Sequence, residues 1–392
     1  MYTENMNEIN TDDMQETGGS AIGDAAESDK ETLFFDNVMT ALAAASPEGS
    51  TIRVIGFERA DKFLRAGYKV VEGDADVTIA RGGEREFALA RTTDAEKLIL
   101  FPTRDYAAAA VAEYRTQDKT FAYMRRGRKP FAAVFDENDI DNNLASIFGE
   151  IISLDLAAFD MMFGAYMRGE RQTDVTENAA KLVTELTAKL KPLEKDSIKQ
   201  RHALIDACKT AARLTERAPA LLHGSGAAQT AEALRMLCSA EDRAVGMRGE
   251  TEMLLGAYVI DFYIKSLISL RPEFPPNNNK RIDSVCEYFR ADLRRACVYV
   301  SPLFAPEKLR LCEYRIGEFR SENLKRLYAL SARQKAAWQV FKRLYPDDGY
   351  SLKTLVDKTD IGICLALAPD VFSADTMLSY LKQTGKLEKY IV

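Results

Sequence analysis

Short strand-like runs alternate with helical runs between Thr51 and Asp136, and this alternation constrains the fold more than any other feature. The strand-like runs are rich in β-branched and other apolar residues: TIRVIG (51–56), YKVVEG (68–73), ADVTIARGG (75–83), KLILFPT (97–103) and PFAAVFD (130–136). Helical runs separate them at 58–67, after Gly83 and at 106–114. Strands that alternate with helices predict a parallel sheet with crossover helices, an architecture typical of nucleotide-binding domains.

The strand signals stop near Ala145, and helical periodicity takes over. It predicts helices at 146–168, 173–190, 195–214, 227–238, 249–270, 279–297, 305–313 and 318–345. We therefore expect an α/β, Rossmann-like domain at 32–145, followed by an all-α domain at 146–392. Within the first of these helices, Phe159, Met162, Phe163 and Tyr166 recur at helical spacing and are predicted to be core residues.

Residues 1–31 form an acidic leader with nine acidic residues and one basic residue, a charge of −8. Since the whole chain carries −6, the remainder is close to neutral at +2. An acidic segment with few aromatic residues is expected to be disordered, and partner binding is the alternative role. The charge balance does not suggest a nucleic-acid-binding protein.

The composition is that of a soluble globular protein, with 46% hydrophobic and 29% charged residues. The longest apolar stretches, such as Leu254–Ile264, contain Asp261 and are too short to span a membrane. We see no secretory signal, and the six cysteines form no CxxC pair. Reduced thiols and a cytoplasmic location are therefore expected.

Several motifs follow one another in a characteristic order. A strand, a glycine pair and a helix span 80–91, and Phe-Pro-Thr ends the strand at 101–103. ASIFGEIISLDLAAFD (145–160), HGSGAAQTAEALRML (223–237) and MRGETEMLLGAYVIDFY (247–263) follow. In this order they resemble the dehydroquinate synthase-like superfamily, which includes iron-containing alcohol dehydrogenases, glycerol dehydrogenase and sn-glycerol-1-phosphate dehydrogenase. FGEIISLDLAAFD and the serine-glycine stretch are most similar to the last branch. The resemblance implies a dehydroquinate synthase-like fold, a nucleotide or other small-molecule ligand, and self-association.

The resemblance places a dinucleotide pyrophosphate at a glycine-rich turn, where backbone N–H groups approach it at a helix N-terminus. The corresponding residues here are Gly82 and Gly83, with Pro102 and Thr103 after the next strand. The family pattern has a third glycine, but this chain has Glu84, whose charge would repel a pyrophosphate. NAD(P) binding and a purely structural turn both remain open.

The resemblance also implies a divalent metal ion, held by an acid after Phe-Gly and by two histidines. Glu150 stands at the acid position, but the first histidine is replaced by Ala228 or Gln229 and the second by Arg248. Arginine is permanently charged and cannot coordinate a cation. We therefore expect no metal, and we predict instead that Arg248 pairs with Glu150.

Three functions are compatible with these residues. The first is a diverged, metal-free and non-catalytic relative that keeps the fold and can bind a nucleotide or a small phosphorylated ligand. The second is an active NAD(P)-dependent oxidoreductase acting on a glycerol-phosphate-like or other alcohol, in which Arg248 polarises the substrate. Glu150, Glu250 or His223 would then accept the proton. The third is a protein-interaction module. The basic run at 124–130 is expected to be a solvated loop, with a phosphate or an acidic partner as the alternative.

Overall fold

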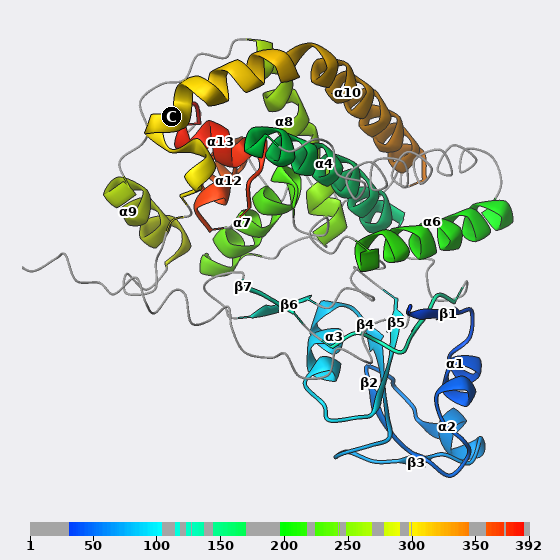
Figure 1. The fold of residues 1–392 in the computed structure, drawn as a ribbon. Coiled ribbons are helices and arrows are strands. Elements are labelled where there is room, and N and C mark those ends of the chain that lie inside the picture. The colour runs from blue at the N-terminus through cyan, green and yellow to red at the C-terminus, as the bar shows by residue number, and fades with distance from the viewer. Residues whose placement is uncertain are drawn as a thin grey trace, which may run out of the picture. The chain divides into compact units, whose positions relative to one another are not determined.

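The computed structural model describes residues 31–103, 114–117, 123–126, 128–136, 144–169, 197–217, 224–241, 243, 248–268, 278–290, 298, 300–344, 358–371 and 374–387. All helices and strands below belong to one compact unit, Leu33–Val392. In Figure 1 the strands of the main sheet and their helices are blue and cyan, and the later helices run from green to red.

The first region is built on a six-stranded parallel sheet. Its strands are β1 (Leu33–Phe35), β2 (Thr51–Ile55), β3 (Lys69–Val70), β4 (Val77–Gly82), β5 (Lys97–Pro102) and β8 (Ala132–Val134), in the order β1-β8-β5-β4-β2-β3. Helices α1 (Val38–Ala45), α2 (Asp61–Arg65) and α3 (Glu84–Arg91) connect them. The predicted α/β region with a parallel sheet is therefore confirmed.

The sheet's hydrophobic core explains why these strands read as continuous apolar runs. Ile79 of β4, Ile99 of β5 and Val134 of β8 are all fully buried. They pack with α1 through Leu42 and with α2 through Phe63 in one cluster. A parallel strand that is covered on both faces does not alternate between apolar and polar residues.

Three parts of this region were not predicted: a strand and a helix at its start, and a β-hairpin after β5. Strand β1 and helix α1 precede the first predicted strand. A separate antiparallel hairpin, β6 (Tyr114–Gln117) and β7 (Tyr123–Arg126), follows β5. The basic run at 124–130 thus begins inside a strand, and the loop prediction is wrong for its first three residues. Most of the helix predicted at 106–114 lies outside the described residues.

The second region is helical, as predicted. Its helices are α4 (Leu144–Arg168), α6 (Ser197–Arg217), α7 (Gly226–Ala240), α8 (Arg248–Ile268), α9 (Asn278–Phe289), α10 (Leu309–Leu344), α12 (Lys358–Val371) and α13 (Met377–Gln383). Two short 3₁₀ helices, η5 (Pro302–Phe304) and η6 (Pro306–Lys308), precede α10. The helices predicted at 305–313 and 318–345 are one continuous helix. The helix predicted at 173–190 lies outside the described residues.

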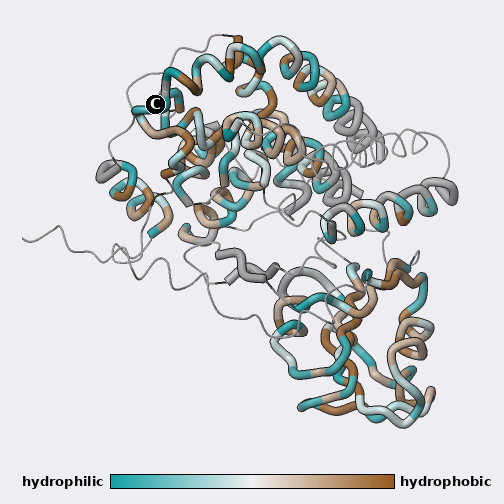
Figure 2. Tube along the Cα trace, in the orientation of Figure 1, coloured by the Kyte–Doolittle hydropathy of each residue, from teal (hydrophilic) through white to brown (hydrophobic). Residues whose placement is uncertain are grey.

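The helical region has its own core, in which aromatic rings pack edge to face. Phe163 of α4 contacts Phe319 of α10 and Tyr380 of α13, with ring centroids 5.4 and 5.9 Å apart. Phe159 and Met162 are buried and Tyr166 packs against the cluster, so their prediction as core residues is confirmed. Along α8 and α10 hydrophobic and hydrophilic residues recur in turn (Figure 2), the pattern of helices with one buried face. Among the described helices, none combines the length and the apolar character that a membrane span requires.

Candidate functional site

The predicted cofactor residues meet where β4 and β5 end. Gly82 is opposite Pro102 in the register of the two strands, and the Thr103 N–H donates to the Gly82 carbonyl at 3.0 Å. Gly82 has a φ of +145°, which favours glycine, and Gly83 is the residue that precedes α3. The structure thus brings together all four residues that the sequence assigned to this turn.

A side chain of the protein itself occupies the turn. The Gly83 N–H donates to Oε2 of Glu86 at 3.0 Å, so this carboxylate caps the helix that starts at the turn. A Cβ atom placed on Gly82 would lie 2.6 Å from the same oxygen. The sequence predicted a repulsive charge from Glu84, and the structure adds a second carboxylate at the turn, that of Glu86. The side chain of Glu84 lies outside the described residues.

Gly56, which the sequence reasoning missed, makes this arrangement sterically possible. It follows β2 with a φ of +74°, and a Cβ atom there would lie 1.9 Å from the Arg81 carbonyl oxygen and 3.1 Å from Cγ of Glu86. Only glycine fits such a close backbone approach. The signal in the sequence was the glycine that ends the run TIRVIG.

The helical region holds a buried polar cluster around Asp160 of α4. Its carboxylate accepts hydrogen bonds from the Gly226 N–H at 2.8 Å and from the Met377 N–H at 2.9 Å. The Tyr263 hydroxyl of α8 lies 3.1 and 3.2 Å from its two oxygens. Burial raises the pKa of Asp160 to about 7, although all three hydrogen bonds act to lower it.

The histidine-replacing positions on α7 lie beside this cluster. Gln229 is completely buried, and its Oε1 accepts a hydrogen bond from the Thr376 hydroxyl at 2.7 Å. Ala228 is also buried, and its N–H donates to the Ser225 hydroxyl at 2.9 Å. The Ser225 hydroxyl lies 3.0 Å from that of Ser153. The side chain of Gln229 is therefore used to join α7 to the residue before α13.

Glu150 is buried on α4, with 6% of its surface exposed. It lies near the buried thiol of Cys208 on α6, whose pKa is raised by burial and further by the negative charge of Glu150. Arg248 and Glu250 lie in the first turn of α8, but their side chains are outside the described residues, as is all of His223. The pairing of Arg248 with Glu150 stays a prediction.

The residues present can now be compared with the groups that the resemblance implies. A pyrophosphate at the Gly82–Gly83 turn would meet the Glu86 carboxylate, which already accepts the Gly83 N–H, so the turn does not fit that group. Glu150 has the chemistry of a metal ligand, whereas Arg248 cannot coordinate a cation and Gln229 is hydrogen-bonded elsewhere. In the described part of the chain, no three His, Cys, Asp or Glu side chains gather as a metal site would require.

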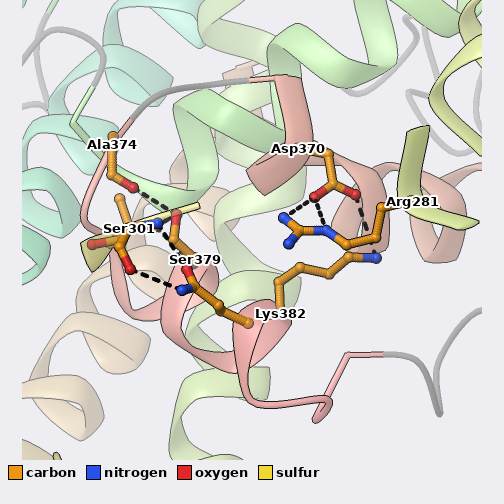
Figure 3. Close-up of polar contacts among 8 residues, drawn as sticks. Arg281, Ser301, Asp370, Ala374, Ser379 and Lys382 are labelled. Carbon is orange, nitrogen blue, oxygen red and sulfur yellow. Dashed lines mark hydrogen bonds and ion pairs between the residues drawn. The ribbon is translucent and has the colours of Figure 1, made fainter. Parts of the chain in front are cut away.

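A second buried polar cluster joins α9, α12 and α13 (Figure 3). One carboxylate oxygen of Asp370 accepts hydrogen bonds from the Nε of Arg281 at 2.8 Å and from another nitrogen of the same guanidinium. The Nζ of Lys382 lies 3.5 Å from the other carboxylate oxygen. Next to it, Gln383 exchanges two hydrogen bonds with the backbone of Ser301, at 2.8 and 2.9 Å. Burial raises the pKa of Asp370 against the lowering effect of the two cations. These contacts hold α13 in place, and none of the residues belongs to a predicted site.

No family model matches the chain, and no curated protein matches its sequence. Solved structures with a similar fold include glycerol dehydrogenase from Schizosaccharomyces pombe, at 11% identity and a TM-score of 0.42, covering 80% of this chain and 89% of that one. A putative alcohol dehydrogenase from Ralstonia eutropha matches at 11% identity and a TM-score of 0.48, covering 92% and 96%. An iron-containing alcohol dehydrogenase from Corynebacterium glutamicum matches at 14% identity and a TM-score of 0.45, covering 92% and 94%. These three structures are thus of a glycerol dehydrogenase and of two alcohol dehydrogenases, one of them iron-containing.

Proposed function

We propose that this chain is a metal-free, non-catalytic protein with a dehydrogenase-like architecture, divided near residue 145 into an α/β region and a helical region. The observation that carries the proposal is the Glu86 carboxylate on the Gly83 N–H. A helix N-terminus binds a phosphate through its free N–H groups and its positive dipole. In this chain a carboxylate three residues away accepts one of those N–H groups and supplies the negative charge.

The metal positions support the same proposal. Gln229 is buried and bonded to Thr376, and an arginine stands at position 248. Polarising an alcohol by a metal ion requires several ligands and an open coordination position. Glu150 is the one residue at these positions that has the chemistry of a metal ligand.

Calorimetric titration with NAD(H) and NADP(H), before and after the addition of Zn²⁺, tests the proposal. We expect no binding in any of these conditions and no oxidation of glycerol, glycerol phosphate or simple alcohols. Saturable binding of a nicotinamide cofactor to the unmodified protein would overturn the proposal. The active oxidoreductase would then be the better assignment, with Arg248→Met as the next variant to assay.

Two variants of Glu86 test whether its carboxylate is what prevents a nicotinamide cofactor from binding at the turn. Glu86→Gln removes the charge but keeps an acceptor for the Gly83 N–H, whereas Glu86→Ala removes both. If Glu86 alone excludes a pyrophosphate, Glu86→Ala will bind NADH measurably and the parent protein will not. Glu72→Gln, at an exposed carboxylate after β3, is the matched control and should behave as the parent. If Glu86→Ala binds NADH no better than the parent protein does, residues other than Glu86 also prevent binding.

A further inference from the structure

Helix α10, drawn from yellow to brown in Figure 1, carries a charge opposite in sign to that of the whole chain. It has nine basic and three acidic residues, a charge of +6, whereas the whole chain carries −6. The inner face of α10 packs into the helical core through Phe319, Leu327 and Leu330. Burying such an apolar face does not require an excess of cations, so the charge of α10 needs a separate explanation.

Exposed residues on the opposite side of α10 follow one another at alternating intervals of three and four. We call them the outer stripe, which begins with Leu311, Tyr314, Glu318, Ser321, Lys325 and Tyr328. Lys335 lies two turns beyond Tyr328 on the same side, so the stripe is about 36 Å long. Tyr314 and Tyr328 have 64% and 53% of their surface exposed. Alternation of three and four residues is the spacing at which one helix packs along another.

The cations of α10 have different partners on its two sides. Beside the inner face, Arg315 donates to a backbone carbonyl of α4, and Arg333 lies 3.5 Å from a carboxylate oxygen of Asp155. Lys325 and Lys335 of the outer stripe are exposed, and neither has an ion pair within the described part of the chain. The inner cations therefore hold α10 against α4, whereas the outer ones are available to an anionic partner.

Small residues separate the large ones on this side of the helix. Gly317 and Ser321 lie between Tyr314 and Lys325, and nothing lies within 4 Å of a Cβ atom placed on Gly317. Small residues let the backbone of a second helix come close, while the tyrosines offer large apolar surfaces with a polar end. This combination fits a helix better than it fits an extended chain.

Glu318 argues against a uniform polyanion such as a nucleic acid or an anionic membrane. Its carboxylate lies in the stripe and accepts hydrogen bonds from the hydroxyls of Tyr314 at 2.7 Å and Tyr166 at 2.9 Å. These two bonds lower the pKa of Glu318, so it is charged at neutral pH and would repel a phosphate. A helix can place an apolar or basic residue opposite Glu318 and its acidic residues elsewhere.

We propose that the outer stripe of α10 is the docking site for an acidic amphipathic helix of another protein. The apolar residues of that helix pack against Leu311, Tyr314 and Tyr328, and its carboxylates face Lys325 and Lys335. Two α10 helices with a charge of +6 each repel one another, which disfavours a second copy of this chain as the partner. This docking site does not depend on the function proposed above.

Fluorescence anisotropy of a labelled synthetic helix, titrated with the full chain, tests the proposal. The probe is an acidic peptide with leucines at alternating intervals of three and four and glutamates beside them, and its control is a scrambled peptide of the same composition. We expect saturable binding of the patterned peptide, at least about tenfold tighter than that of the scrambled one and weaker as salt is added. Equal affinity for the two peptides would overturn the proposal.

Variants of the protein locate the binding surface. The double variant Lys325→Glu/Lys335→Glu and the single variant Tyr328→Ala should each weaken binding of the patterned peptide by at least about tenfold. The matched controls are Arg65→Glu on α2 and Tyr258→Ala on α8, which change exposed residues outside the stripe and should bind as the parent does. If the stripe variants also bind as the parent does, the outer stripe is not the docking site.

The same double variant separates the other possible partners. We expect an oligothymidylate and vesicles that contain phosphatidylserine to bind the parent more weakly than the patterned peptide does. Tighter binding of either probe, lost in Lys325→Glu/Lys335→Glu, would overturn the choice of an acidic helix. A parent that sediments as a dimer and a double variant that sediments as a monomer would instead assign the stripe to a contact between copies of this chain.

Discussion

Helix α3 follows Gly83 directly and helix α7 begins at Gly226, and a carboxylate binds the N–H group of each glycine, yet the two carboxylates come from different places. At α3 the Gly83 N–H is bound by Glu86, three residues further along the chain. At α7 the Gly226 N–H is bound by Asp160, which is 66 residues away and also binds the start of α13. The first cap is a local structure on a half-buried turn. The second links distant parts of the helical core, so losing it should affect the whole region.

The largest effect is expected from Asp160→Ala. This change leaves two buried backbone N–H groups and the Tyr263 hydroxyl without their acceptor. A buried donor that loses its partner costs about 1–3 kcal/mol, so we expect the free energy of unfolding to fall by about 3–5 kcal/mol. Chemical denaturation followed by circular dichroism measures it. Asp261→Ala, on the exposed side of α8, is the control, and equal losses for the two variants would contradict the role of Asp160.

A smaller effect is expected from Gly226→Ala. The added Cβ atom would lie 2.3 Å from the Tyr263 hydroxyl oxygen and 3.1 Å from a methyl group of Val259, so the helices must move apart. Overpacking of this kind costs about 1–3 kcal/mol. Gly317→Ala on α10 is the matched control, since nothing lies within 4 Å of its Cβ position. Alanine should stabilise that helix by about 0.5–1 kcal/mol. Opposite signs for the two variants in thermal unfolding would support the close contact, and equal signs would argue against it.

The smallest effect is expected from Glu86→Ala. It removes a local cap from a short helix, so the free energy of unfolding should fall by about 1 kcal/mol. Glu86→Gln should retain most of that stability, because an amide oxygen can still accept the Gly83 N–H. Both are measured by chemical denaturation of the full chain. A loss for Glu86→Ala as large as that for Asp160→Ala would remove the distinction between a local and a tertiary cap.

The sequence predicted the fold well where a pattern is local. The strands from Thr51 onward were found because β-branched residues cluster between glycine-ended turns. Strand β1 was missed because Leu-Phe-Phe is short and follows the acidic leader. Strand β7 was predicted as a loop because it contains two arginines, and its pairing with β6 is visible only in the structure. Helix α10 was predicted as two pieces, although Gly317 sits within it without interrupting it.

The candidate site was predicted less completely, for the same reason. Gly82, Gly83, Pro102 and Thr103 are brought together because the carboxyl ends of neighbouring parallel strands meet at one edge. Asp160 was visible only as an acid within an apolar stretch, LDLAAFD, and nothing local showed what it binds. Its partners start two helices that are 66 and 217 residues away.

The sequence by itself determined two properties of this protein: a region of alternating strands and helices that forms a parallel sheet, and a helical region that follows it. These properties depend on residue type and on short-range periodicity, which can be read along the chain. The tertiary structure alone decided which carboxylate closes the helical core, because Asp160 binds N–H groups that are 66 and 217 residues away along the chain. Burial and hydrogen bonding depend on which distant segments pack together, and it is this packing that raises the pKa of Asp160 to about 7.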